Sequence, residues 1–76
     1  PRQLVRGMLG HRKQRERQIL RELEKGTRVI PVMVAHMYKG LDPRLTGAAG
    51  RSVLAHLYDL RARGVVRARD DEWELA

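Results

Sequence analysis

At 76 residues the chain has room for one domain, and a chain of this length buries only about 60% of its unfolded surface. It contains no cysteine, which excludes disulfides and thiolate metal sites and predicts a cytoplasmic location. Its apolar runs fall short of the roughly 20 residues that span a bilayer, and its first residues lack the apolar region of a secretory signal. Starting at Pro1, the sequence fits either a protein that has lost its initiator Met or a part of a longer chain.

The net charge of +7 is unevenly distributed along the chain. Residues 1–28 hold nine basic residues and three Glu, residues 29–60 hold three basic and two acidic residues, and residues 61–76 hold four of each. Nearly all of the excess positive charge therefore belongs to the first predicted helix. Such a balance favours polyanionic partners and says little about the fold.

The sequence predicts a first helix that begins at Leu4 or Gly10 and ends at Lys25, with Gly26 as its stop. Residues 1–10 are interpreted as a linker or an N-terminal extension of this helix, and residues 11–76 as the folded domain. One face of the helix carries Val5, Leu9, Ile19, Leu20 and Leu23, with Arg12 and Glu16 among them. Residues 10–18 include no strongly apolar side chain, so the front half of this helix cannot be buried in the domain's own core.

The middle of the chain predicts a short strand followed by two more helices. Thr27–Val29 fits the strand, and Pro31 fits the first turn of a helix that ends near Tyr38. Gly40 and Pro43 mark a turn. The third helix is expected from Leu45 to Arg63, with Gly64 as its stop, and its apolar stripe is Leu45, Ala49, Val53, Leu57 and Leu60.

Apolar and polar residues alternate at the end of the chain, as they do in the strands of a β-hairpin. Val65–Arg69 and Glu72–Leu75 are the predicted strands, with Trp73 and Leu75 on one face. The fold class is therefore α+β, mainly helical: a winged helix-turn-helix with the order α-β-α-α-β-β. The predicted core consists of Ile19, Leu23, Ile30, Val34, Val53, Leu57, Leu60 and Trp73.

The three histidines do not form a metal-binding motif. His11, His36 and His56 lie 25 and 20 residues apart on three different helices, without a neighbouring histidine or any cysteine. His56 is interpreted as a hydrogen-bonded histidine at the edge of the core. The sequence also lacks a catalytic triad, a carboxylate pair and a phosphate-binding glycine loop, so we expect no catalytic residue, no metal and no cofactor in this chain.

Two helix faces are candidates for binding. Basic side chains recur every four residues on the first helix and are candidate phosphate contacts: Lys13, Arg17, Arg21 and Lys25. A solvated face is the alternative interpretation of this stripe. On the third helix, the outward face would read bases in a DNA-binding winged helix. Here it holds mainly small residues: Gly47, Ala48, Arg51, Ala55, Tyr58 and Ala62. This composition suits packing better than base recognition, and in the hairpin the acids of "DDE" offset Arg67 and Arg69.

Three segments, "HRKQRERQIL", "VIPVMVAHMY" and "AAGRSVLAHLYDLRARGVV", carry a resemblance to a known family. They resemble the C-terminal winged-helix domain attached to metallo-β-lactamase-fold hydrolases, a group with endoribonuclease and thioesterase-like members. The resemblance covers roughly His11–Val66. The matching residues are His11, Arg12, Arg15, Glu16, Ile19, Ile30, Tyr38, Ser52, Ala55, His56, Leu57, Leu60 and Gly64.

The resemblance implies an accessory domain that flanks a zinc-dependent hydrolase domain, in the same chain or as a separate one. The family's H-x-H-x-D-H metal motif belongs to the hydrolase domain and is absent here, so no catalytic role transfers to these residues. The expected interface residues are His11, Arg12, Glu16, Arg51, Ala55 and Tyr58. Arg12 and Glu16 would either pair with each other or reach across to the hydrolase domain. An independent nucleic-acid-binding regulator is the main alternative, and a protein-interaction module without a hydrolase is a third.

Overall fold

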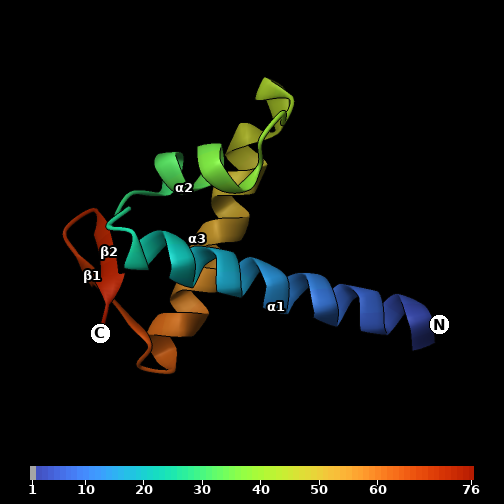
Figure 1. The fold of residues 1–76 in the computed structure, drawn as a ribbon, viewed down its shortest axis with the longest axis horizontal. Helices are drawn as coiled ribbons and strands as arrows, with labels where there is room; N and C mark the ends of the chain where they lie inside the picture. The colour runs from blue at the N-terminus through green and yellow to red at the C-terminus, as the bar shows by residue number, and fades with distance from the viewer. Residues whose placement is uncertain (1) are drawn as a thin grey trace.

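The computed structural model describes the backbone of residues 2–76 and the side chains of residues 12–76. Its elements in chain order are α1 (Arg2–Glu24), α2 (Ile30–Met37), the short 3-10 helix η1 (Pro43–Leu45), α3 (Thr46–Ala62), β1 (Val66–Arg69) and β2 (Glu72–Leu75) (Figure 1). Three helices and one antiparallel hairpin confirm the mainly helical α+β winged-helix fold. The side chains of Val5, Leu9 and His11, for which the sequence makes predictions, lie outside the described residues.

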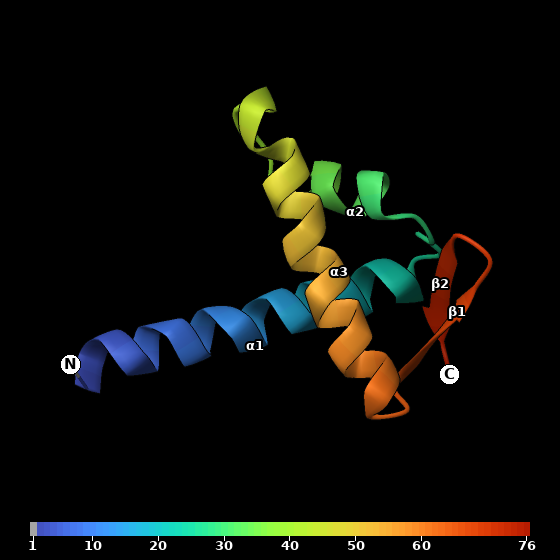
Figure 2. The ribbon, with the colours of Figure 1, turned by 180° about the vertical axis from the view of Figure 1, so that it is seen from behind.

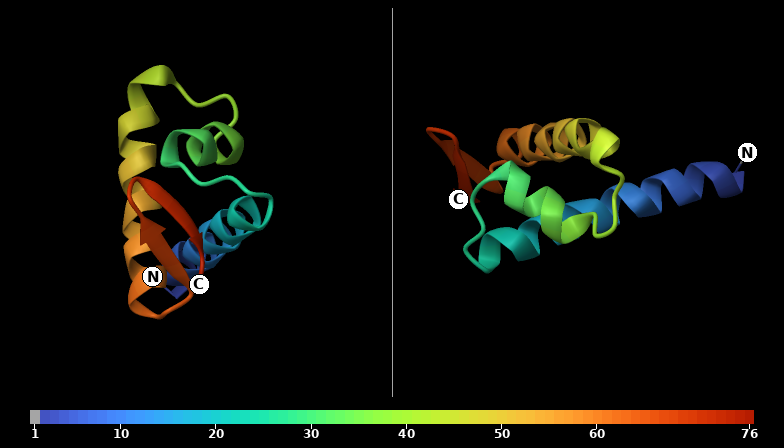
Figure 3. Two further views of the ribbon diagram at one scale, coloured as in Figure 1. Left: turned by 90° about the vertical axis from the view of Figure 1, so that its left-hand side faces the viewer. Right: turned by 90° about the horizontal axis from the view of Figure 1, so that it is seen from above.

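Helix α1 contacts the rest of the domain through its C-terminal half. Figures 1 and 2 show α3 crossing α1, α2 packed beside α3, and the hairpin at the C-terminal end of α1. The N-terminal half of α1 extends away from the other elements in Figures 1 and 2 and in the right-hand view of Figure 3. Among the described side chains, Ile19 is the earliest buried one. This agrees with the prediction that the front half of the helix is not covered by the domain's own core.

Glycine ends both long helices in the same way. Gly26 and Gly64 adopt left-handed conformations, with φ of 95° and 77°. After α1, the amides of Gly26 and Thr27 donate to the carbonyls of Leu23 and Glu22 at 3.1 and 2.9 Å. After α3, the amides of residues 64 and 65 donate to the carbonyls of residues 61 and 60 at 3.0 and 2.9 Å. These are Schellman motifs, which satisfy the last carbonyls of a helix and turn the chain away from its axis.

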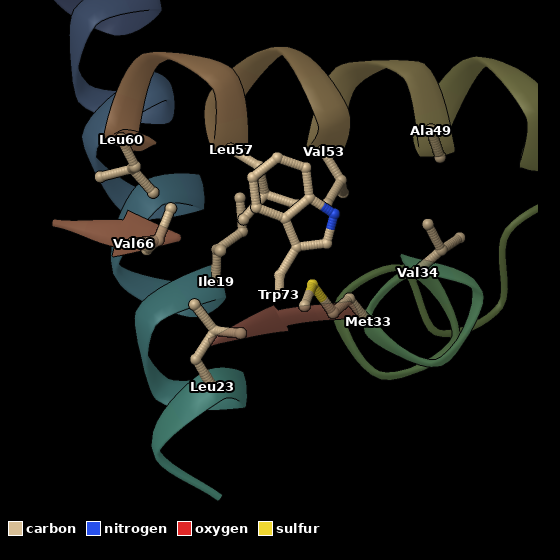
Figure 4. Close-up of a cluster of buried hydrophobic side chains, with 10 residues drawn as sticks. All are labelled: Ile19, Leu23, Met33, Val34, Ala49, Val53, Leu57, Leu60, Val66 and Trp73. Atoms are coloured by element: carbon tan, nitrogen blue, oxygen red, sulfur yellow. The ribbon is translucent and has the colours of Figure 1, made fainter. Parts of the chain in front are cut away.

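The core lies where α1, α2, α3 and the hairpin meet (Figure 4). The buried hydrophobic residues are Ile19, Leu23, Met33, Val34, Ala49, Val53, Leu57, Leu60, Val66 and Trp73. Seven of the eight predicted core residues are among them, and the eighth, Ile30, is partly buried against the cluster. Of the other three buried residues, Ala49 belongs to the predicted apolar stripe of α3, and Met33 and Val66 were not predicted.

Two residues that the apolar patterns assigned to a buried face are exposed. Leu45 is 52% exposed because it ends η1 before α3 begins, and so lies beyond the surface that α2 covers. Leu75 is 38% exposed, whereas Trp73 on the same strand is 6% exposed. Val66, which pairs with Leu75 on the neighbouring strand, is 2% exposed, so the core covers this end of the sheet on β1 and leaves Leu75 at its edge.

The segment Thr27–Val29, predicted as a strand, is extended but does not form one. Val29 has φ −119° and ψ 142°, which is extended backbone. The Trp73 amide donates to the Arg28 carbonyl at 2.8 Å. This single hydrogen bond joins the segment to β2, where a third strand would form a series of them. In the described residues the sheet therefore has two strands, in the register Val66↔Leu75 and Arg69↔Glu72. The first β in the predicted order is the part of the topology that was wrong.

Candidate interaction surface

The outward face of α3 is exposed along its whole length. Arg51, Ala55, Tyr58 and Ala62 form a stripe at three- and four-residue spacing, opposite the buried stripe that begins at Ala49. Gly47 and Ala48 continue the exposed face toward the start of the helix. This is the surface that the sequence predicts to be small and weakly polar. It presents one arginine and one tyrosine among residues that let another surface approach closely.

The basic stripe of α1 also faces solvent. Lys13, Arg17, Arg21 and Lys25 are all exposed. Lys25 Nζ lies 3.9 Å from Glu22 Oε2, and the other three form no ion pair within the described part of the chain. Residues four apart on a helix are separated by about 6 Å along its axis, so the stripe is a regular row of cations.

Glu16 does not pair with Arg12, which was one of the two predicted arrangements. Its Oε2 instead lies 2.9 Å from Arg63 Nη2, and Arg63 also pairs with Asp59 at 3.0 Å. The Glu16 carboxylate raises the pKa of the Arg63 guanidinium above its ordinary value. Glu16 thus ties α1 to the C-terminal end of α3, while Arg12 remains exposed. The pattern missed this pair because it joins two helices that are distant in the sequence.

His56 is partly buried on α3 near Arg12 and Glu16 of α1, which agrees with its predicted place at the edge of the core. The predicted hydrogen bond of its side chain is not found among the described residues. Burial lowers the pKa of its imidazole, and the neighbouring charge of Arg12 lowers it further. Glu16 and Asp59 act in the opposite direction without overcoming these effects. Burial and the charge of Arg12 both favour the neutral form of the imidazole. His11 lies outside the described side chains, and His36 lies on α2, in a different environment.

His36 and Glu22 form a pair that sequence reasoning missed. Glu22 is 5% exposed, and its Oε1 lies 2.5 Å from His36 Nδ1. Glu22 follows Ile19 by three residues, so its position lies on the apolar face of α1, and that spacing was the available signal. A buried carboxylate needs a hydrogen-bonding partner to offset its lost hydration. His36 supplies this partner and joins α2 to the last turn of α1.

We expect His36→Ala to lower the free energy of unfolding by about 1–3 kcal/mol, because it leaves the buried Glu22 oxygen without its nearest donor. Urea unfolding at neutral pH measures the change. Lys25→Ala is the matched control, since that cation is more distant and well exposed and should have a much smaller effect. Equal unfolding midpoints for His36→Ala and the unmodified chain would contradict a stabilising role for the pair.

Arg15 makes a second contact between α1 and α2. Its guanidinium carbon lies 4.3 Å from the centroid of the Tyr38 ring, and its Nη1 donates to Gln18 Oε1 at 2.9 Å. The cation and the ring attract each other through the ring's quadrupole. Arg15 and Tyr38 both belong to the residues that carry the family resemblance. Their contact gives them a structural role inside the domain.

Arg67 of the hairpin pairs across the two strands and not with the acids of the turn. Arg67 Nε lies 3.2 Å from Glu74 Oε1 on the opposite strand. Arg28, in the segment after α1, lies 4.0 Å from Glu72 and 3.9 Å from Glu74. The Arg67 contact lowers the pKa of the Glu74 carboxyl below its ordinary value. In the described part of the chain, Arg67 is therefore paired, whereas Arg69 forms no ion pair.

A family model described as the beta-lactamase associated winged helix domain matches residues 30–73. The match spans 44 of the 76 residues, more than half of the chain. The chain belongs to the beta-lactamase associated winged helix domain family. This confirms the resemblance drawn from the sequence. No curated protein and no solved structure matches the chain.

The match to the beta-lactamase associated winged helix domain begins at the first residue of α2 and ends on β2. It includes the whole exposed face of α3 and leaves out α1 with its basic stripe. Within the described side chains of this winged helix domain, no three potential ligands gather as a metal site would require. None of its described helices combines the length and apolar character needed to cross a bilayer.

Proposed function

We propose that this winged helix is a non-catalytic accessory domain of a metallo-β-lactamase-fold hydrolase. It flanks the catalytic domain, in the same chain or as a separate one, and shapes one side of the substrate cleft. Zinc and the catalytic residues would belong to the hydrolase domain. Membership in the beta-lactamase associated family supports the association with such a domain.

The composition of the α3 face carries the proposal. A winged helix that reads bases needs several Arg, Lys, Asn or Gln side chains on this face. Here Arg51 and Tyr58 are surrounded by glycine and alanine, and all of them are exposed. Small residues create a flat surface that a second protein surface can approach closely. Arg12 is exposed as well, and its charge acts on His56 of α3.

The proposal is tested by placing bulk on the α3 face. The reading frame that contains or neighbours the chain should encode a hydrolase domain with an H-x-H-x-D-H motif. In that parent protein, Ala55→Trp should raise the KM of hydrolysis by about tenfold or more. The bulky side chain would prevent the α3 face from packing on the hydrolase domain, so one side of the substrate cleft would be displaced. The control is Ala35→Trp, an equally large change at an exposed alanine of α2. A frame without the motif, or equal KM values for the two variants, contradicts the proposal.

Weak contact with an RNA or DNA backbone is a second proposed activity, and the basic row on α1 favours it. This contact would read no sequence, because charge attracts phosphate without distinguishing bases. It would also be the main activity of a small independent regulator, the alternative to a hydrolase accessory domain. The two functions use different helices and can therefore be separated by substitution.

A further inference from the structure

An arginine near the C-terminal end of α3 lies against two aromatic rings. Arg61 Cζ is 5.1 Å from the centroid of the Tyr58 ring and 5.9 Å from that of Trp73. The two rings meet edge to face, with their centroids 6.0 Å apart and their planes at 67°. Trp73 is buried in the core, whereas Tyr58 is 49% exposed. The guanidinium is thus supported by a ring that the core fixes and a ring that solvent reaches.

Arg61 has no carboxylate partner in the described part of the chain, and residues 1–11 contain no acidic residue. Four other arginines do have such partners: Arg28, Arg44, Arg63 and Arg67. The nearest acid in sequence, Asp59, pairs with Arg63. A guanidinium that lies over aromatic rings keeps its N–H edge free, and its planar fork fits a carboxylate with two parallel hydrogen bonds. The rings also restrict its rotamers, so less entropy is lost when a partner binds.

We propose that Arg61, supported by Tyr58 and Trp73, is the point at which the partner hydrolase domain docks through a carboxylate. The inference rests on the proposed function and specifies the chemistry of its interface. The partner surface presents an Asp or Glu side chain to Arg61 and an apolar strip to the small residues Ala55 and Ala62. The exposed tyrosine forms the apolar neighbour of this charged contact.

The surroundings of Arg61 favour a protein carboxylate over a nucleic-acid phosphate. Arg51, the preceding arginine on α3, lies ten residues away, or about 15 Å along the helix, and Arg63, two residues after Arg61, is paired with Glu16 and Asp59. A phosphate backbone is bound by a row of closely spaced cations, which α1 has and α3 lacks. An isolated arginine beside tyrosine, tryptophan and alanine has the composition of the centre of a protein interface.

The test uses the parent protein, folded intact and then cut at the junction between its two domains. Arg61→Gln should raise the dissociation constant of the two pieces by at least about tenfold. Arg61→Lys should recover only part of the affinity, because lysine keeps the charge and loses the fork. Arg17→Gln is the matched control, since it removes the same charge from the exposed stripe of α1 and should leave the dissociation constant unchanged.

The outcomes separate this inference from the proposed function. Pieces that stay bound, with equal dissociation constants for Arg61→Gln and Arg17→Gln, overturn the role of Arg61 and leave the accessory domain in place. Pieces that separate without any substitution overturn the docked arrangement itself. If Arg61→Gln weakens binding of single-stranded RNA and leaves docking unchanged, Arg61 is a phosphate contact and the inference is wrong. An unchanged unfolding midpoint for Arg61→Gln shows that the variant folds.

Discussion

Leu57→Ala is expected to lower the free energy of unfolding by about 2–5 kcal/mol. Leu57 is completely buried on α3, within the cluster that also contains Ile19 and Trp73 (Figure 4). Truncation removes the transfer free energy of the lost methyl groups and leaves a cavity that the core fills only in part. A domain of this size has a total stability of about 4–11 kcal/mol, so the variant loses a large fraction of it. Urea unfolding followed by Trp73 fluorescence measures the loss.

Leu45→Ala provides the matched control. It removes the same atoms from a leucine one residue before α3, where the side chain is 52% exposed. Its effect should stay within about 0.5 kcal/mol, as for most surface substitutions. A similar loss for both variants would mean that the burial assigned to the α3 stripe is wrong, as would a loss below about 0.5 kcal/mol for Leu57→Ala.

Binding of the chain to single-stranded RNA is expected to weaken on the order of 50-fold between 50 and 200 mM salt. The expectation assumes that Lys13, Arg17, Arg21 and one neighbouring cation each neutralise one phosphate. Each contact on a single strand contributes about −0.7 to the slope of log affinity against log salt, which gives roughly −3 in total. All of these residues on α1 are exposed. Replacing Lys13, Arg17 and Arg21 together with alanine should flatten the slope by about two units.

Substitutions on α3 serve as the control for this titration. Arg51→Ala and Tyr58→Ala should barely change the salt slope, because their face is proposed to bind protein. Unrelated duplex and single-stranded oligonucleotides should show no preference for one sequence. A clear preference for one duplex, lost in Arg51→Ala, would make α3 a recognition helix. That result would favour an independent nucleic-acid-binding regulator over a hydrolase accessory domain.

Much of the fold could be predicted because its determinants are local. The spacing of Val53, Leu57 and Leu60 marks the buried side of α3, and the same spacing places Arg51 and Tyr58 on the exposed side. Local signals fail where an element ends. Leu45 continues the apolar spacing of α3 backward, past the point where another helix covers it. Thr27–Val29 has the composition of a strand, but only one hydrogen bond from β2 reaches it.

The polar contacts of the candidate surface were harder to predict, because each joins helices that are distant in the sequence. A helical wheel places Glu16 near Arg12, four residues away on the same helix, and does not show that Arg63 approaches from α3. The Glu22–His36 pair depends on the packing of α2 against α1. The composition of each exposed face is a property of one helix and was predicted. The positioning of Arg61 over two rings depends on how α3 meets the hairpin.

The glycines that end α1 and α3 have a consequence for chirality. A Cβ atom added to Gly26 or Gly64 would meet nothing within 4 Å, so space is not what requires glycine there. Their positive φ angles are the conformation that an L-residue adopts at a cost of roughly 1–2 kcal/mol. A D-amino acid adopts this conformation without strain, because it mirrors the ordinary helical region. At both helix ends the backbone therefore favours D-alanine over L-alanine, on the ground of its φ angle alone.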